Sequence, residues 1–264
     1  MNAVTRLALP MWSLFARELL RFARQPGRIA GALGTPLLFW AVLGSGFGSS
    51  LRLGGPTGGM DTVTYFFPGM LLLVVVFAAI FSAISVIQDR TEGFLQGVMA
   101  APVPRLAIVA GKVAGGAALG FVQGLLLLLL APLAGVPLTA ATFAAACGVL
   151  LLCALALSGL GFAFAWRMDS VQSFHAVMNL LLFPMWLMSG AFFPPGGAAE
   201  WVRWVMRLNP LAYGLSALRG VMQGPGAAQA LGEPELGLSL AVLAGFSLAV
   251  LCLSAFAAAR SDTR

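Results

Sequence analysis

The stretch QDRTEGFLQGVMAAPVPR, residues 88–105, carries four charged residues between two long apolar runs of a chain that is only 9% charged. The apolar runs on both sides place it at a membrane surface. Within it, Phe94, Leu95 and Val98 fall at i, i+1 and i+4, the charges gather near the start, and the prolines near its end stop a helix. We therefore predict a short amphipathic helix between two spans, suited to docking a soluble partner. An ordinary charged loop is the alternative.

The composition of the whole chain is typical of a membrane protein. Of its 264 residues, 60% are hydrophobic, against roughly 45–50% in soluble domains. A membrane span needs about 20 apolar residues, so we expect an all-α integral membrane protein whose transmembrane domain covers residues 29–264. Its six transmembrane helices are expected at approximately residues 29–50, 63–87, 106–133, 142–166, 173–193 and 236–259.

Residues 1–28 precede the first span and show two opposed faces. Large apolar residues recur at helical spacing on one face and arginines lie on the other: Trp12, Phe15, Leu19 and Phe22 against Arg17, Arg21, Arg24 and Arg28. This pattern predicts an amphipathic helix in the membrane interface, with its arginines toward anionic headgroups. Gln25-Pro26-Gly27 then turns the chain into the bilayer.

The distribution of basic residues predicts the orientation of the chain. If the N-terminus is cytoplasmic, eleven of the fifteen basic residues lie inside: Arg6, Arg17, Arg21, Arg24, Arg28, Arg90, Arg105, Lys112, Arg167, Arg260 and Arg264. Only four lie outside: Arg52, Arg203, Arg207 and Arg219. The positive-inside rule therefore predicts both termini in the cytoplasm. The polar turns at 88–105 and 167–172 then face the cytoplasm together, and the net charge of +6 needs no nucleic-acid partner.

Motifs for chemistry on this chain are absent from the sequence. The only Gly-Lys pair, Gly111-Lys112, has Leu106 where a phosphate-binding loop needs its first glycine. The three cysteines lie inside apolar runs, and with the single His175 they form no metal-binding pattern. We expect no catalytic site, no metal and no cofactor on the chain.

Two alternatives stay open at this stage. An intramembrane serine hydrolase would use Ser158 or Ser189 with His175, although neither serine stands in a GxSxG setting. A channel or scaffold would work without an ATPase. Proton- or ion-driven carriers usually have charged residues in mid-membrane, and spans 1, 2, 4, 5 and 6 carry none in their middles, so the driving energy is expected to come from a partner.

Two stretches together resemble one known family. The first is residues 88–105, and the second is NLLLFPMWLMSGAFFPPGGAAEWVRWVMRLNPLAYGLSALRG, residues 179–220. In this order, with six spans, they resemble the ABC-2 type permeases, the membrane subunits of ATP-binding-cassette exporters. The resemblance covers nearly the whole chain.

The resemblance implies sites of contact with an ATPase. Residues 89–101 would form the first coupling helix, residues 167–172 a second contact, and the N-terminal helix the family's connecting helix. The residues that carry these roles are Asp89, Arg90, Glu92, Gly93, Phe94, Pro102, Arg105, Asp169, Arg17 and Arg21. The family often has a leucine- and glutamate-rich run after the glycine, whereas here the run is FLQGVM.

The resemblance also implies an assembly and a path. Two permeases, identical or different, would work with two ATPase subunits that hold ATP and Mg, in the lipid of a bacterial inner membrane. Re-entrant helices between spans 5 and 6 would include Pro194, Trp201, Trp204, Asn209 and Pro210. An apolar path for a drug, lipid or lipid-linked glycan would be lined by Phe77, Phe81, Phe183, Met185 and Met188, unless these residues only face lipid or pack helices.

Overall fold

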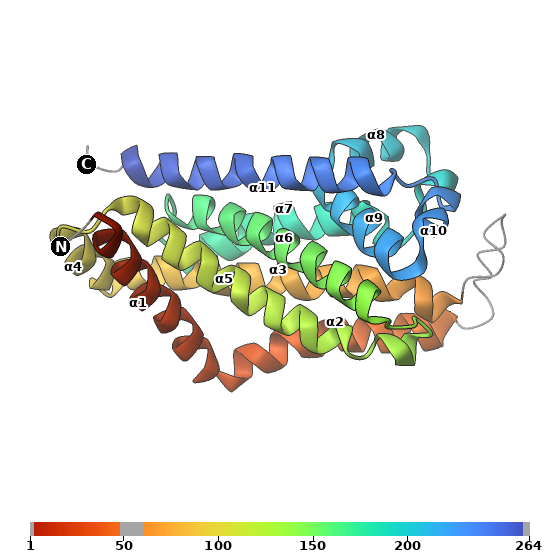
Figure 1. The fold of residues 1–264 in the computed structure, drawn as a ribbon, viewed down its shortest axis with the longest axis horizontal. Helices are drawn as coiled ribbons and strands as arrows, with labels where there is room; N and C mark the ends of the chain where they lie inside the picture. Colours follow the sequence, from red (N-terminus) through yellow and green to blue (C-terminus); the bar gives the residue numbers. More distant parts are fainter. Residues whose placement is uncertain (1–2, 48–60, 261–264) are drawn as a thin grey trace.

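The computed structural model describes residues 3–47 and 61–260, and all regular structure within them is helical (Figure 1). Six segments are long and apolar enough to cross a membrane, which confirms the predicted all-α fold with six spans. They are α2 (Pro26–Phe47), α3 (Thr62–Thr91), α5 (Arg105–Leu128), α6 (Ala140–Ala165), α7 (Val171–Trp186) with its continuation η2 (Leu187–Ala191), and α11 (Leu236–Ala259). The predicted end of the first span at 48–50 and most of the loop after it lie outside the described residues.

Shorter elements gather at the two ends of the bundle (Figure 1). At one end, which we call the α4 end, lie α4 (Phe94–Ala100) and the start of α1 (Ala3–Ala23). At the other, the α10 end, lie the helices that connect α7 to α11: α8 (Glu200–Leu208), α9 (Pro210–Gln223) and α10 (Pro225–Ala230). Two 3-10 turns, η1 (Ala131–Ala134) and η3 (Pro195–Gly197), complete the described chain.

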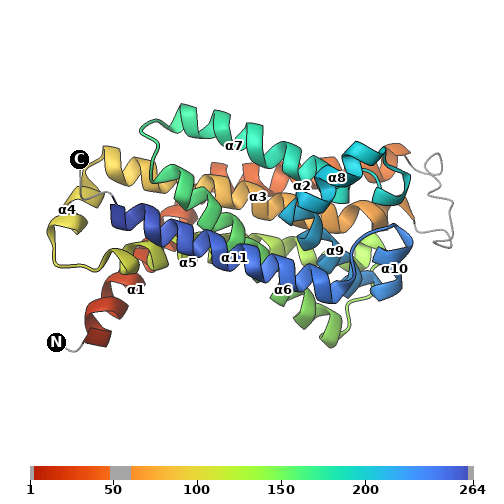
Figure 2. The same cartoon turned by 90° about the horizontal axis from the view of Figure 1, so that it is seen from above.

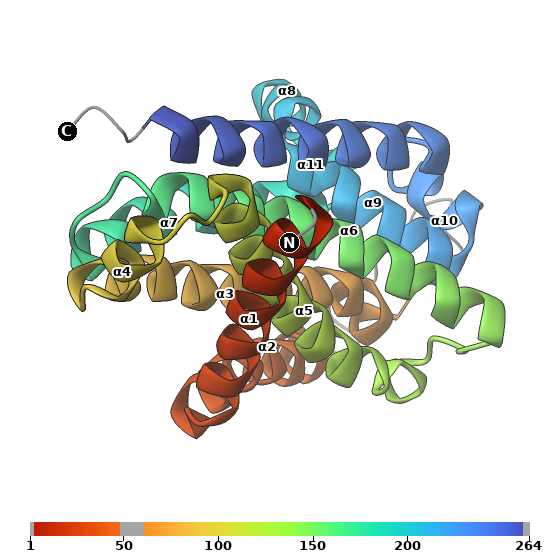
Figure 3. The ribbon, with the colours of Figure 1, turned by 60° about the vertical axis from the view of Figure 1, so that its left-hand side comes forward.

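Helix α3 is the centre of the bundle. In its apolar span 83% of the residues are buried, and from Tyr65 to Val76 every side chain is buried. A helix that is apolar on all sides packs in a protein interior. By contrast, only 17% of the α2 span and 22% of the α11 span are buried within this chain. These two helices lie at opposite edges of the bundle, while α7 runs along a third side (Figures 2 and 3).

Small residues on α5 let three helices approach it closely. A Cβ added to Gly116 would lie 2.5 Å from Ser82 Oγ of α3, and one on Gly124 would lie 3.4 Å from Leu150 of α6. These glycines therefore serve packing within the chain. A second pair of glycines, not noticed in the sequence, faces α1: a Cβ on Gly115 would lie 2.8 Å from Glu18 Cβ. A Cβ added to Gly111 would similarly lie 2.7 Å from the carbonyl oxygen of Met11 on α1.

We expect Gly115→Val to push α1 away from α5, because no room exists for a side chain beside Glu18. Overpacking of this kind costs about 1–3 kcal/mol of unfolding free energy. The matched control is Gly245→Val on α11, where nothing lies within 4 Å of an added Cβ. Thermal unfolding in detergent and protease cleavage of α1 measure the effect. Equal stability of the two variants would contradict close packing of α1 on α5.

Candidate functional site

Charged side chains of three helices meet at the α4 end, where α1 crosses α3 and α5. We call this cluster the polar corner, and it consists of Arg17, Glu18 and Arg21 on α1, Ser85, Gln88 and Asp89 on α3, and Lys112 on α5. Three of its charged members, Glu18, Asp89 and Lys112, are almost completely buried. A buried charge is stable only when it is paired and hydrogen-bonded, so the geometry of the corner decides how these helices are held.

The carboxylate of Asp89 is the hub of the polar corner. Its Oδ1 accepts a hydrogen bond of 2.8 Å from Arg21, and its Oδ2 accepts one of 2.7 Å from Arg17. The ammonium of Lys112 also donates to Oδ2. One carboxylate on α3 thus joins α1 and α5. Predicted as a contact to an ATPase, Asp89 instead faces the protein interior, with no exposed surface of its own.

A second carboxylate, that of Glu18, shares Lys112 with Asp89. Glu18 pairs with the Lys112 ammonium through Oε1 and accepts a 2.7 Å hydrogen bond from the Ser85 hydroxyl through Oε2. Lys112 also donates to Ser85, over 3.3 Å. The sequence analysis did not identify Glu18 or Ser85. The sequence signal for them was Lys112, the only lysine of the chain, which lies two turns inside an apolar segment. A charge at that depth needs a charged or polar partner.

Arg90, the next residue along α3, points away from α1 and binds the turn between α6 and α7. It donates to the carbonyl oxygens of Trp166, at 2.6 Å, and Met168. It also forms an ion pair of 3.0 Å with Asp169, whose side chain is 95% exposed. The two polar turns found in the sequence are therefore adjacent, and Arg90 fixes their relative position.

Helix α4 is separate from α3, so the coupling helix expected over residues 89–101 is divided between the end of α3 and α4. The break lies at Gly93, whose φ of +79° is one that residues with a side chain rarely adopt. After it, Leu95 is buried and the Phe94 ring stacks under the Arg17 guanidinium, 3.6 Å from the ring centroid. Gln96 and Met99 remain exposed. Helix α4 thus lies against the polar corner and presents its other face outward.

The remaining predicted coupling residues flank α4. Pro102 is exposed in the link from α4 to α5, and the link ends at Pro104, immediately before α5. Arg105 donates a 2.7 Å hydrogen bond to the Ala258 carbonyl and so ties the start of α5 to the end of α11. Glu92 pairs with Arg21 over 3.5 Å, and its side chain is 58% exposed.

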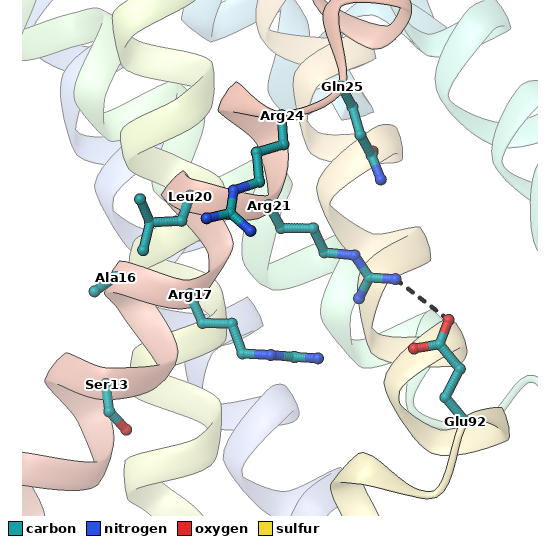
Figure 4. Close-up of a pocket in the computed structure, with 8 residues that line it drawn as sticks. All are labelled: Ser13, Ala16, Arg17, Leu20, Arg21, Arg24, Gln25 and Glu92. Atoms are coloured by element: carbon teal, nitrogen blue, oxygen red, sulfur yellow. Dashed lines mark ion pairs between the residues drawn. The ribbon is translucent and has the colours of Figure 1, made fainter.

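An open groove lies beside the polar corner, between α1 and the end of α3 (Figure 4). We call it the arginine groove. Its volume is about 740 Å³, and its lining residues are Ser13, Ala16, Arg17, Leu20, Arg21, Arg24, Gln25 and Glu92. Figure 4 shows the three arginine side chains on one wall and Glu92 on the other, joined to Arg21 by the ion pair.

The predicted path residues fall into two groups. Phe77 and Phe81 stack on each other on α3, with ring centroids 6.4 Å apart, and both are partly buried. Met185 and Met188 line an apolar groove of about 390 Å³ between the end of α7 and the helices α8 and α9. Phe183 is exposed on α7 and contacts Trp186, with centroids 5.8 Å apart.

The segment predicted to be re-entrant folds as short helices at the α10 end. Trp201 and Trp204 are exposed on α8, which packs inward through Val202 and Met206 instead. Pro194 precedes the 3-10 turn η3, and Pro210 is the first residue of α9.

Asn209 holds two of these elements together. Its amide nitrogen donates to the carbonyls of Met185, at 2.5 Å, and Met188, at 3.1 Å, while its amide oxygen accepts from the Leu211 N–H. One side chain thus caps α9 and fixes the end of α7.

A buried ion pair at the α10 end was not predicted. Arg219 of α9, counted in the sequence among the outside charges, has no exposed surface and pairs with Glu233 just before α11. Its guanidinium lies 4.5 Å from the Tyr65 ring centroid and donates to the Tyr65 carbonyl at 3.3 Å. The Tyr65 hydroxyl donates to the Gly190 carbonyl at 2.8 Å. These contacts join α3, η2, α9 and the start of α11.

The residues of the hydrolase alternative are not brought together. The Ser189 hydroxyl donates to the Trp186 carbonyl at 2.6 Å, and neither Ser158 nor Ser189 hydrogen-bonds to His175 in the part of the chain that the structure describes. His175 and Ser189 lie on α7 and η2, separated along the helix by about 20 Å at the usual rise per residue. No pair of serine and base is formed.

Comparison with known proteins decides the family. The model of the ABC-2 type transporter family matches residues 10–222. The chain belongs to this family. It is 26% identical over 212 residues to the inner membrane transport permease YadH of Escherichia coli (strain K12), covering 78% of this chain and 80% of that protein. Over 206 residues it is 28% identical to nodulation protein J of Rhizobium meliloti (strain 1021), covering 74% of each chain.

A further relative is the putative transport permease ycf38 of Cyanophora paradoxa, 23% identical over 212 residues, which cover 79% of this chain and 72% of that protein. The family and the six apolar helices make this ABC-2 permease a multi-pass protein of the bacterial inner membrane, as predicted. Its place as a transmembrane permease subunit follows from the same match.

For this permease we expect Asp89→Asn to be strongly destabilising. The substitution preserves size but leaves Lys112, Arg17 and Arg21 without their shared counter-charge, and breaking a buried ion pair from one side costs about 3–5 kcal/mol. Thermal unfolding of the detergent-solubilised protein measures the loss. The matched control is Asp169→Asn, which removes an exposed carboxylate and should change stability little. Similar stability of both variants would contradict the role of Asp89.

Proposed function

We propose that this permease is the membrane subunit of an exporter driven by ATP hydrolysis on a separate ATPase subunit, with two permeases and two ATPases in the working unit. The observation that carries the proposal is the link made by Arg90 between α3 and the α6–α7 turn. Two exposed turns held in one fixed arrangement suit a rigid contact with a soluble subunit. They lie at the end that the distribution of basic residues predicts to be cytoplasmic.

The contact surface in this proposal differs from the one first expected. Asp89, Arg90, Arg17 and Arg21 bind one another or neighbouring helices, so we assign them the role of supporting the contact. The surface itself comprises Gln96 and Met99 of α4 together with Glu92 and Asp169, all exposed. A push on α4 then reaches α3 and α5 through Leu95 and the buried charges behind it.

We further propose that the cargo is hydrophobic or amphipathic: a drug, a lipid or a lipid-linked glycan. Support comes from the apolar groove of about 390 Å³ between the end of α7 and α8–α9, which includes Met185 and Met188. Methionine side chains adapt to different apolar shapes. The second permease would meet the exposed apolar face of α7, where Leu180 is 79% exposed and Phe183 is also exposed.

Co-purification tests the ATPase contact. From native membranes, gently extracted full-length chain should bring down a soluble protein with a GxxxxGK loop in one-to-one amount, identified by mass spectrometry. We expect Gln96→Arg/Met99→Arg to lower its recovery about tenfold or more, equivalent to about 1.4 kcal/mol of binding free energy. The exposed residues of α10 supply the matched control, Gln229→Arg/Ala230→Arg at the opposite end.

Undiminished recovery with the α4 variant would place the contact elsewhere. A chain that is recovered alone and is active in liposomes without ATP would contradict the proposal and favour a channel.

A further inference from the structure

The arginine groove has an excess of positive charge that the protein does not neutralise. Its lining holds three arginines and one carboxylate, Glu92. Arg17 and Arg21 share Asp89, and Arg21 also reaches Glu92. Arg24, also in the lining, forms no ion pair with any described residue and is exposed. A negatively charged group in the groove would therefore meet one free guanidinium and two partly engaged ones.

The apolar side chains beside the groove fit a lipid better than a soluble acidic segment. Leu20, which lines the groove, is 60% exposed, and Trp12 on the same side of α1 is 64% exposed. With Leu9 and Ala16 they follow helical spacing, so they form one apolar strip beside the arginines. Apolar side chains next to arginines are typical of a helix lying at a membrane surface.

We propose that the arginine groove binds one anionic phospholipid from the adjacent leaflet, with the phosphate on Arg24 and its neighbouring guanidiniums and an acyl chain along Leu20. Phosphatidylglycerol has this chemistry. Arginine suits such a site because its planar fork binds phosphate oxygens in pairs. The site adjoins the proposed ATPase contact, since Glu92 belongs to both. It does not rest on that contact or on the cargo, because it requires only that α1 lies at the membrane surface.

Lipid retention in native mass spectrometry tests the proposal. The full-length chain, with any subunits that it retains, is exchanged into mixed micelles of phosphatidylglycerol and phosphatidylcholine. Wild type should keep one phosphatidylglycerol in preference to phosphatidylcholine. Arg24→Gln should lower that retention about fivefold, the effect of one arginine beside an anionic headgroup. Arg24→Lys keeps the charge but lacks the planar fork, so it should restore only part of that retention.

The choice of residue and control keeps the result interpretable. Arg24 is exposed and outside the polar corner, so Arg24→Gln should fold normally, whereas Arg17 and Arg21 are needed by Asp89. Arg260→Gln is the matched control, because it removes one exposed arginine at the end of α11, away from the groove. It should leave retention unchanged.

Three results would overturn the proposal. Equal retention by wild type and Arg24→Gln would show that the groove holds no lipid. Equal losses in Arg24→Gln and Arg260→Gln would show only a general effect of charge. Loss of a co-purifying soluble subunit in Arg24→Gln, with lipid retained, would assign the groove to protein docking.

Discussion

The arrangement of the α4 end depends on one buried carboxylate. Asp89 on the central helix receives Arg17 and Arg21 from α1 and Lys112 from α5, so three helices meet at a single pair of oxygens. Because a buried charge without partners is so unfavourable, these cations must be in place whenever the chain is folded. The close contact of α1 with Gly111 and Gly115 brings Glu18 within reach of the same lysine. Packing and electrostatics thus favour one position of α1.

This constraint also explains how an exposed helix is held in place. Helix α4 is short and begins after a break at Gly93, so it could not hold its position alone. It is held by Leu95 and by Arg17 over Phe94, hence by the same charges that hold α1. At the opposite end Arg219 and Glu233 have an equivalent role, since they join α9 and the start of α11 to α3 and the end of α7. Each end of α3 is therefore fixed by a buried ion pair.

The spans were predictable because long apolar runs leave few other structures in a membrane. The charged stretch at 88–105 was found for the same reason, as a polar interruption. The contacts of its residues were not predictable. Asp89 and Arg90 are neighbours in sequence, yet Asp89 faces α1 and Arg90 faces the α6–α7 turn. The pair of Arg219 with Glu233 forms only when the segment between α9 and α11 folds back, and the local sequence pattern does not predict that contact. The break before α4 was visible as Gly93, but a glycine also fits an unbroken helix.

These contacts make α1, α4, the end of α3 and the start of α5 one rigid unit. Pulsed electron paramagnetic resonance between labels on Ser13→Cys and Ala101→Cys, in a background without native cysteines, measures the α1 to α4 distance directly. With the labels diluted so that only one permease of the proposed pair carries them, the complex with the proposed ATPase should give one narrow distance that is the same without nucleotide and with bound ATP. A broad distribution, or a distance that shifts between the two states, would contradict a rigid corner held by Asp89.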